Sequence, residues 1–372
     1  MRFFSSSFNP SEIENHTYAI QTITAEAVRR VLAKPRWTRH DLPILLSPAA
    51  TAFLSEMSHI STHLTRKRFG NTIQLFIPLY LSNRCYNRCA YCGFSVEHKY
   101  RRVTLSEEEI LKEGRLLYEK GFRHILLLTG EAEDAVGVPY ISRAVELLRP
   151  YFSSIGLEVQ PLKTEEYAVL IQKGADSLTL YQETYHPQAY AKYHTAGKKK
   201  NYGNRLDAAD RAGEAGFYRM TIGALLGLYE WRFEALAIAA HLDYLQKRYW
   251  RTQLGVSFNR IQKMIGEFSP DFDVTARDVE QLIVAFRLVY PDLLMTLSTR
   301  EPASVRDRLM GIGVTAMSAE SNTSPGGYSG VQAEKQFEIS DERSLNAIVT
   351  VLKQNRLEPV FKDWCKEIAE VP

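Results

Sequence analysis

Apolar residues follow two different spacings along the chain, and the spacing changes near residue 70. Before that point, Ile, Val and Leu recur at helical intervals over 20–32 and again over 48–64. Ser47 followed by proline is a common helix start and predicts where the second of these segments begins. After residue 70, short aliphatic and β-branched runs alternate with longer segments of helical spacing, which predicts strand–helix units.

Eight short runs in the second part of the chain have the length and composition of buried strands. They span 72–81, 124–129, 155–161, 177–182, 220–226, 254–261, 294–299 and 314–319. The segments between them carry helix signals, such as Ser106 with Glu109 three residues later and Gly121 beyond the helix end. The predicted helices span 105–120, 163–173, 206–215, 231–249, 275–289 and 305–310.

Eight strand–helix units over about 250 residues are typical of a (β/α)8 TIM-type barrel. The alternative is a doubly wound open sheet with a separate cap, but no G-x-G-x-x-G follows a predicted strand, which disfavours its dinucleotide-binding version. We therefore predict an α/β barrel over 71–321. A helical extension over 1–70 would precede it, and a C-terminal segment over 322–372 would pack on it.

Composition and charge narrow the class of protein. The chain has 372 residues, of which 45% are hydrophobic and 24% charged, so it has the apolar material for a large core and is not of a disordered or collagen-like type. Its formal charge is only +3, which gives no footprint for nucleic acid. No apolar stretch approaches the roughly 20 residues of a membrane span, and the N-terminus lacks a secretion signal pattern. We predict a cytoplasmic protein.

Three of the four cysteines, Cys85, Cys89 and Cys92, lie directly after the first predicted strand. Such crowding suits a metal in a reducing compartment better than disulfides. Three thiolates can hold three corners of a cubic iron–sulfur cluster and leave one iron open. The alternative is a structural zinc with His98 as its fourth ligand, in a non-catalytic scaffold. Cys365 is remote in sequence.

The carboxyl ends of the predicted strands are rich in polar groups, which is where a barrel places its chemistry. They include TGE after the second strand, YQETYH after the fourth and STRE after the seventh. We expect the basic run over 198–200 to be a solvated loop.

The spacing C-x3-C-x2-C, with Tyr91 before the last cysteine, resembles the signature of the radical S-adenosylmethionine enzymes. The likeness continues through RFGNTIQLFIPLYLSN, YCGFS, LLLTGE, EVQPL, YQETYH, YHTAGKKKNYGNRL, LSTRE and PGGY. These segments resemble the tyrosine lyases of thiamin thiazole biosynthesis, the 2-iminoacetate synthases. The resemblance implies Cα–Cβ cleavage of L-tyrosine to 2-iminoacetate (dehydroglycine) and p-cresol, with 5'-deoxyadenosine and methionine as further products.

The resemblance also implies two cofactors and the residues that bind them. A [4Fe-4S] cluster would be held by the three cysteines, and S-adenosylmethionine would bind its open iron. Tyr91 would lie beside the adenine, although it could equally be a packing residue of the loop. The remaining expected contacts are Thr129, Gly130 and Glu131 for the methionine amine, Glu158 and Gln160 for the ribose, and Arg205 for the methionine carboxylate.

An amino-acid substrate needs a cation for its carboxylate, and the resemblance assigns this role to Arg300 at the end of the seventh predicted strand. The alternative is a surface ion pair of Arg300 with Glu301 or Asp307. Ser318 and Ser321, which end the eighth strand, would assist with their hydroxyls. The phenol side of the pocket would be lined from Tyr181, Gln182, Glu183 and His186.

Two observations separate neighbouring activities. The tyrosine lyases of hydrogenase maturation carry a C-terminal extension with three further cysteines, whereas this sequence offers only Cys365 there, so the thiazole activity is preferred. A tryptophan lyase stays open, because a few side chains decide between indole and phenol. The stretch SFNRIQKMIGEF keeps Arg260 but lacks the prolines that relatives commonly carry, which leaves the role of Arg260 open.

The expected partners follow from the chemistry. A one-electron donor such as flavodoxin or ferredoxin must reduce the cluster, and the resemblance implies a complex with thiazole synthase. The basic side chains around the cysteines either dock an acidic electron carrier or offset the charge of the cluster. They are Arg84, Arg88, Lys99, Arg101 and Arg102.

Overall fold

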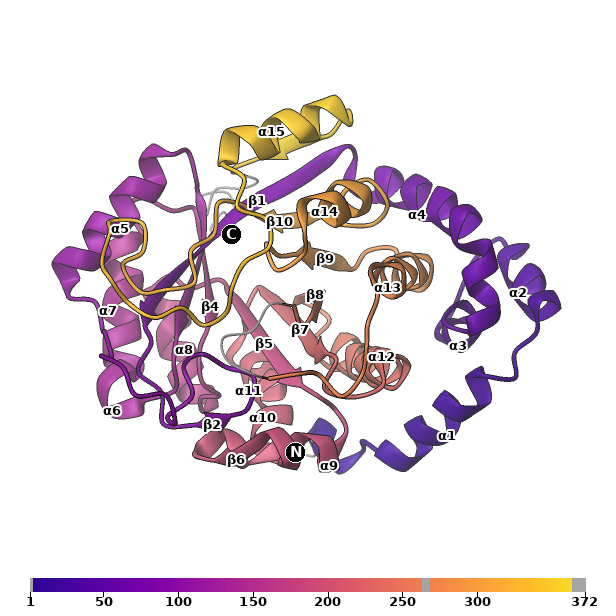
Figure 1. Ribbon diagram of the computed structural model, residues 1–372, viewed down its shortest axis with the longest axis horizontal. Coiled ribbons are helices and arrows are strands. Elements are labelled where there is room, and N and C mark those ends of the chain that lie inside the picture. The colour runs from indigo at the N-terminus through magenta and orange to yellow at the C-terminus, as the bar shows by residue number, and fades with distance from the viewer. Residues whose placement is uncertain (1–2, 263–267, 363–372) are drawn as a thin grey trace.

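The computed structural model describes residues 3–262 and 268–362 as a ring of parallel strands surrounded by helices (Figure 1). Each predicted strand is present, with ends that differ by a few residues, and β1 pairs with β10 to close the ring. In ring order the strands are β1 (Thr72–Ser82), β3 (His124–Thr129), β4 (Ser154–Glu158), β5 (Ser177–Glu183), β7 (Arg219–Leu226), β8 (Gln253–Arg260), β9 (Leu294–Leu297) and β10 (Ala316–Ser318). The predicted (β/α)8 barrel is confirmed.

Helices between the strands form the outer layer, and local sequence signals set their ends. Ser106 and Glu109 form the predicted capping box at the start of α5, and Gly216 ends α11 in a left-handed conformation. The helices of this layer are α5 (Glu107–Glu119), α6 (Glu133–Val136), α7 (Val138–Leu148), α8 (Thr164–Lys173), α9 (Pro187–Tyr193), α10 (Tyr202–Leu206), α11 (Ala208–Ala215), α12 (Trp231–Arg248), α13 (Ala276–Val289) and α14 (Ala303–Leu309).

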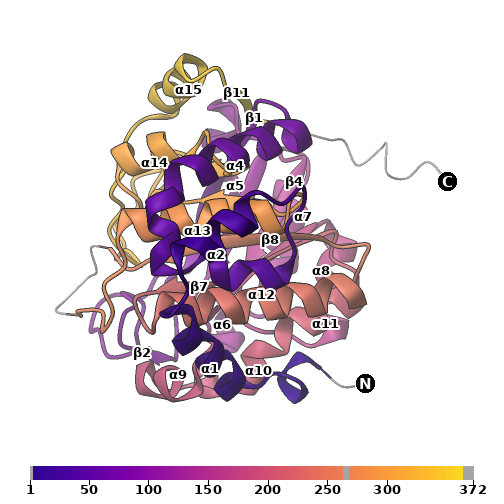
Figure 2. The ribbon, with the colours of Figure 1, turned by 90° about the vertical axis from the view of Figure 1, so that its right-hand side faces the viewer.

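The N-terminal segment is helical, but its helices begin and end differently from the prediction. The helix expected over 20–32 is the shorter α2 (Ala25–Leu32), which Thr24 caps, and Ile20 instead ends a preceding helix, α1 (Pro10–Ile20). The segment after Ser47 starts as a 3-10 turn and continues as α4 (Leu54–Phe69). With α3 (Leu42–Leu45), these helices cover α12 and α13 on one side of the barrel (Figure 2).

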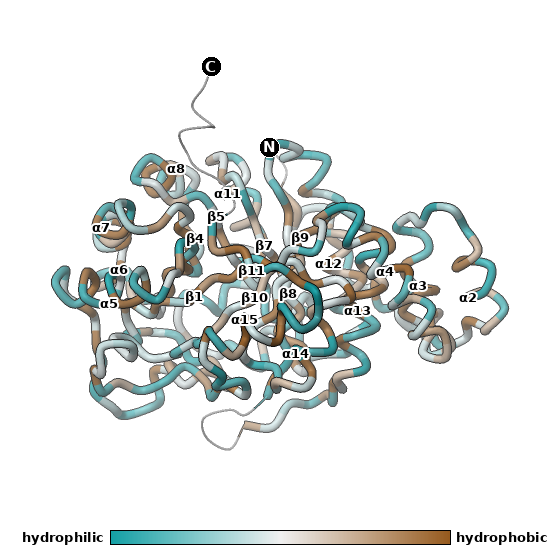
Figure 3. Tube along the Cα trace, turned by 90° about the horizontal axis from the view of Figure 1, so that it is seen from above, coloured by the Kyte–Doolittle hydropathy of each residue, from teal (hydrophilic) through white to brown (hydrophobic). Residues whose placement is uncertain are grey.

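This arrangement explains why α12 and α13 are apolar on more than one face. Both lie between the barrel strands and the N-terminal helices, so residues such as Phe233, Leu242 and Phe286 are almost fully buried. Figure 3 shows hydrophobic positions concentrated along the central strands, with hydrophilic ones mostly at the periphery. None of the described helices combines the length and apolar character that a membrane span requires.

After β10 the chain passes over α5 on one side of the barrel and then forms α15 (Leu345–Gln354) and β11 (Glu358–Val360). β11, which was not predicted, adds a ninth strand to the barrel sheet. It pairs in parallel with the first residues of β1, from Thr72↔Glu358 to Gln74↔Val360. Asp341 forms a buried ion pair with Arg306, which holds the segment before α15 against α14. Both ends of the described chain therefore pack on the barrel.

Candidate active site

The cysteines lie in the loop that follows β1, at the carboxyl ends of the barrel strands. Arg102 holds this loop together: its guanidinium donates to the carbonyls of Asn83, Phe94, Ser95 and His98 at 2.7–3.1 Å. The Arg102 guanidinium is therefore used within the loop. We no longer count Arg102 among the side chains expected to dock an electron carrier. The other four basic residues of that set are exposed, and Arg88 pairs with Glu97 at 3.0 Å.

A second segment, quoted above as YHTAGKKK, pairs with the cysteine loop. The short strands β2 (Arg88–Cys89) and β6 (His194–Ala196) are antiparallel, with Cys89 opposite His194. The Tyr91 hydroxyl lies 2.7 Å from His194 Nε2. Gly197 has φ +83°, and a Cβ at this position would collide with Asn87 Oδ1. Only glycine therefore allows the two segments to approach this closely.

The three thiols are free, and Cys89 is buried. Burial raises the pKa of each thiol, that of Cys92 to about 11. Without a cation the site thus favours neutral thiols, and a bound cationic centre would replace their protons. Among the residues that the structure describes, no three His, Cys, Asp or Glu side chains gather as ligands of a single metal ion. His98, the fourth ligand of the zinc alternative, is exposed. The exposed position of His98 disfavours it as the fourth ligand of a structural zinc.

Buried ion pairs lie beside the cysteine loop. Arg205 contacts Glu131 at 2.9 Å and Glu183 at 3.2 Å, and Lys199 Nζ contacts Glu183 Oε1 at 2.7 Å. Burial alone would raise the pKa of Glu183, but Lys199 and Arg205 lower it to about 2. Asn87 joins this group to the cysteine loop by donating to Glu131 at 2.7 Å and accepting from the Lys199 backbone N–H at 2.9 Å.

Lys199 corrects the expectation of a solvated loop over 198–200. Its side chain is only 13% exposed, whereas Lys198 and Lys200 are exposed. Burial and the neighbouring Arg205 oppose its charge, yet Glu183 keeps the pKa of Lys199 above its ordinary value. Three consecutive lysines gave no signal for which one points inward, because that depends on the short 3-10 turn Lys198–Lys200.

One cavity opens at the carboxyl ends of the strands, with about 910 Å³ of space counting the part open to solvent. Its lining joins the cysteine loop to the predicted substrate residues. Predicted residues among its lining are Tyr91, Cys92, Glu158, Tyr181, Glu183, Arg300, Ser318 and Ser321. Burial and the charge of Glu183 raise the pKa of Glu158 to about 7. The cavity thus combines the Cys92 thiol, a titratable carboxyl and a cation in one space.

Arg300 has no carboxylate partner among the described residues. Glu301 instead receives two hydrogen bonds from Arg260 at 2.7 Å, and Asp307 pairs with Arg343 at 2.8 Å. The surface pairs weighed for Arg300 are therefore not formed, and Arg260 has a structural contact that the sequence left open. Ser318 Oγ accepts from the Thr299 N–H at 3.1 Å, while the buried Ser321 hydroxyl has no partner in residues 3–262 and 268–362.

Several predicted residues lie away from this cavity. Gln160 lines a second cavity, which it shares with Glu131, Lys199 and Arg205, and its Nε2 donates to the Val136 carbonyl. Gln182 is buried outside the main cavity. His186 stacks on Tyr229 and lies 3.4 Å from Glu14. Gln182 and His186 are therefore not placed to line the phenol side.

Thr129 is the last residue of β3 and Gly130 follows it, next to the cysteine loop. The Thr129 hydroxyl is buried and has no partner within the part of the chain that the structure describes. A Cβ at Gly130 would collide with the Arg84 carbonyl and lie 3.0 Å from Cys85 Cβ. The glycine thus lets the end of β3 touch the backbone that carries the first cysteine.

Other lining residues were missed from the sequence. Asn259 accepts from Ser257 and Ser298, both at 3.2 Å, and alternation along β8 could have placed Ser257 and Asn259 on one face. Gln336 and Phe337 also line the cavity, but they follow the last barrel strand in a segment without periodicity. No local pattern could have assigned them to the site. Cys365 and positions 263–267 of the SFNRIQKMIGEF stretch lie outside the described residues.

Comparison with known proteins agrees with this geometry. Residues 79–240 match the model of the Radical SAM superfamily, and residues 257–358 match the Biotin and Thiamin Synthesis associated domain. The chain is 42% identical to 2-iminoacetate synthase of Escherichia coli (strain K12), over 98% of this chain and 97% of that protein.

Two solved structures have the same fold over nearly the whole chain. A crystal structure of HydG, a maturase of the [FeFe]-hydrogenase, has a TM-score of 0.91 and 28% identity, covering 97% of this chain and 82% of that one. HydG from Carboxydothermus hydrogenoformans has a TM-score of 0.87 and 31% identity, covering 96% of this chain and 85% of that one.

The barrel and its three-cysteine loop define a radical S-adenosylmethionine enzyme, a class that uses a [4Fe-4S] cluster together with S-adenosylmethionine. Within it, the chain belongs to the 2-iminoacetate synthase family and is a lyase. The family and the activity predicted from the sequence are confirmed.

Proposed function

We propose that this chain cleaves the Cα–Cβ bond of L-tyrosine to 2-iminoacetate and p-cresol, and so supplies the thiazole moiety of thiamin. The observation that carries the substrate class is Arg300, a cation that has no carboxylate partner among the described residues and shares one cavity with Cys92. A free guanidinium in a partly buried cavity is matched to a carboxylate by its planar pair of donors. An amino-acid carboxylate satisfies this requirement.

We assign the cluster to Cys85, Cys89 and Cys92, and S-adenosylmethionine to the cavity beside them. When bound, the cluster and S-adenosylmethionine would supply radical chemistry, through the one-electron cleavage of S-adenosylmethionine at its sulfonium. Glu131 would accept from the methionine amine, since Arg205 and Asn87 already fix its carboxylate. Thr129, whose hydroxyl is unpartnered, and Gly130 would form the adjoining surface, and Tyr91 would lie beside the adenine.

The roles expected for Gln160 at the ribose and for Arg205 at the methionine carboxylate change once their positions are considered. Glu158 lines the main cavity and is our candidate for the ribose hydroxyls, whereas Gln160 faces the second cavity and would act through the backbone it supports. Arg205 is held by two carboxylates and the Tyr181 carbonyl. It would reach a carboxylate ligand only together with Lys199, which lines both cavities.

The substrate would be held by Arg300 with the hydroxyls of Ser318 and Ser321. Ser321 is the stronger candidate of the two serines for a substrate contact. Its hydroxyl lies in the cavity lining, buried and without a partner among the described residues. Buried hydroxyls normally find a partner, so this atom fits a hydrogen bond to the substrate. A carboxylate bound here would place the amino-acid backbone between Arg300 and the cofactor side of the cavity.

We also propose a docking face for the electron donor, over the cysteine loop. Tyr86 and Val96 are 49% and 45% exposed there. The exposed cations around them are Arg84, Arg88, Lys99 and Arg101. An apolar centre with a basic rim suits an acidic carrier such as flavodoxin or ferredoxin.

Because 2-iminoacetate hydrolyses readily, we propose direct transfer to thiazole synthase. We place the enzyme in the cytoplasm, where thiolates stay reduced.

The test is p-cresol release by anaerobically reconstituted protein supplied with S-adenosylmethionine, dithionite and L-tyrosine. Formation of p-cresol together with 5'-deoxyadenosine supports the proposal. Formation of 5'-deoxyadenosine without p-cresol would refute tyrosine as the substrate while leaving the cofactor assignment intact. Tryptophan, assayed in parallel for an indole product, distinguishes the related aromatic lyase.

A further inference from the structure

The segment from 322 to 340, which we call the C-terminal strap, links β10 to α15 and passes over α5 on one side of the barrel (Figure 1). It is fixed against the cysteine loop by a backbone hydrogen bond, in which Gly93 N–H donates to the Gln336 carbonyl at 2.9 Å. Within the strap, Gln336 N–H donates to the Thr323 carbonyl at 3.0 Å. The backbone of Gln336 is thus held next to the last cysteine.

The side chain of Gln336 lies between a tyrosine and that cysteine. Tyr80 Oη donates to Gln336 Oε1 at 2.8 Å, and Gln336 Nε2 donates to Cys92 Sγ at 3.9 Å. A ligating thiolate can only accept, so the amide NH2 must face the sulfur and the amide oxygen must face Tyr80. Tyr80 is buried on β1 and packs edge-on against Phe94, which fixes its hydroxyl in place.

We propose that Gln336 is a positioning residue for the cluster: its amide donates a hydrogen bond to the Cys92 sulfur, and Tyr80 sets the orientation of that amide. A donor at a ligating sulfur stabilises the reduced, more negative form of a cluster and so raises its reduction potential. This inference rests on the proposed function only in taking Cys92 as a ligand of the [4Fe-4S] cluster.

Three variants isolate the hydrogen bond. Gln336→Leu removes the donor at similar volume, and Tyr80→Phe keeps Gln336 but frees its amide to rotate. Gln332→Leu makes the same chemical change at an exposed position of the strap and is the matched control. Each protein is reconstituted anaerobically, its iron and sulfide are measured, and the midpoint potential is obtained without tyrosine by dithionite titration, followed through the electron paramagnetic resonance signal of the reduced cluster.

We expect a lower midpoint potential for Gln336→Leu than for the wild-type protein and Gln332→Leu, with a smaller shift in the same direction for Tyr80→Phe. A Gln336→Leu protein with a full cluster and the wild-type potential would overturn the inference. If Gln336→Leu fails to hold iron, Tyr80→Phe decides: a lowered potential supports the inference and an unchanged one overturns it. A wild-type protein with a normal cluster but no p-cresol would refute the tyrosine proposal alone.

Discussion

The guanidinium carbon of Arg300 lies 3.3 Å from the centre of the Phe337 ring. Arg300, which follows β9, is therefore stacked on a residue of the C-terminal strap. Stacking covers one face of the guanidinium and leaves its edge, which carries the N–H donors, free for a ligand. The strap therefore both lines the cavity and orients the residue that we assign to the substrate carboxylate.

Replacing Arg300 with alanine should separate cofactor chemistry from substrate chemistry. We expect the Arg300→Ala protein to keep its cluster and to cleave S-adenosylmethionine, while kcat/KM for tyrosine falls about 100-fold, as for a lost charge-assisted pair of about 3 kcal/mol. The measurement is p-cresol and 5'-deoxyadenosine from the same reaction. Normal p-cresol formation by this variant would remove Arg300 from the substrate site.

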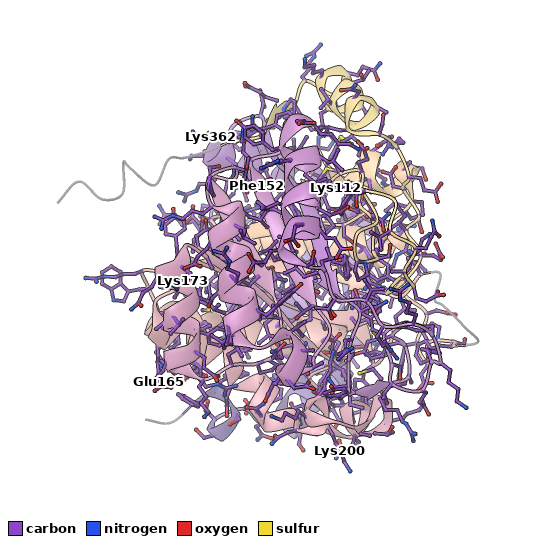
Figure 4. The ribbon with its side chains drawn as sticks, turned by 90° about the vertical axis from the view of Figure 1, so that its left-hand side faces the viewer. Lys112, Phe152, Glu165, Lys173, Lys200 and Lys362 are labelled. Carbon is purple, nitrogen blue, oxygen red and sulfur yellow. The ribbon has the colours of Figure 1, made fainter. Side chains whose placement is uncertain are left out.

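Replacing the buried Lys199 should destabilise the site, because Glu183 would lose one of its two cations. We expect Lys199→Met to lower the free energy of unfolding by about 2 kcal/mol and to lower the iron content after reconstitution. The matched control is Lys200→Met, at an exposed position at the edge of the molecule (Figure 4). Equal melting temperatures for the two variants would contradict the buried role of Lys199.

Gly197→Ala tests the contact between the cysteine loop and β6. A methyl group there would collide with Asn87 in addition to straining a backbone at φ +83°. Gly216 is the control, since its φ is +92° but nothing lies within 4 Å of a Cβ. Gly216→Ala should cost only the backbone strain of about 1–2 kcal/mol. Gly197→Ala should in addition lose iron, and equal iron contents for the two variants would argue against the contact.

Glu234 predicts a pH dependence of stability. It is fully buried on α12, where it accepts from Thr184 Oγ1 and the Tyr185 N–H, and burial raises its pKa from 4.5 to about 8. The native state therefore holds a proton that the unfolded state has lost between these values. The contribution of Glu234 to stability is fully present below pH 4.5 and is lost as the pH rises through 8.

The Glu234→Gln protein should consequently lose less stability than the wild-type protein when the pH is raised from about 5 to 8. Urea unfolding at several pH values measures this slope. Glu165→Gln, at an exposed position on α8 (Figure 4), should keep the wild-type slope. A wild-type slope in Glu234→Gln would show that this carboxyl is ionised in the native protein.

The eight barrel strands could be predicted because each is a short, buried run whose composition records its environment locally. The cysteine loop could be placed at the end of the first strand for a similar reason, since its three cysteines are close together in the sequence. The break between α1 and α2 was missed because Thr24 was not considered as a cap. The strand β11 was missed because three residues, Glu358–Val360, carry too little pattern to stand out.

The missed site residues share another cause. Lys199, Gln336 and Phe337 reach the cavity through contacts between segments far apart in the sequence, such as Gly93 with Gln336. Gln182 and His186 show the converse error, since they belong to a polar strand end but face away from the cavity. Polar letters at a strand end indicate the correct edge of the barrel, and only the register of the strand decides which of them face inward.

The pairing of β1 with β10 and β11 has a consequence for biosynthesis. The chain leaves the ribosome from its N-terminus, so the cysteine loop is made long before the strands that close the ring beside β1. Until β10 has been made, β1 lacks one of its two neighbours in the ring, and the cysteine loop follows an edge strand. Once residues 316–340 are in place, β10 closes the ring beside β1 and Gln336 of the strap lies against Cys92, so this contact forms only after most of the barrel has been made.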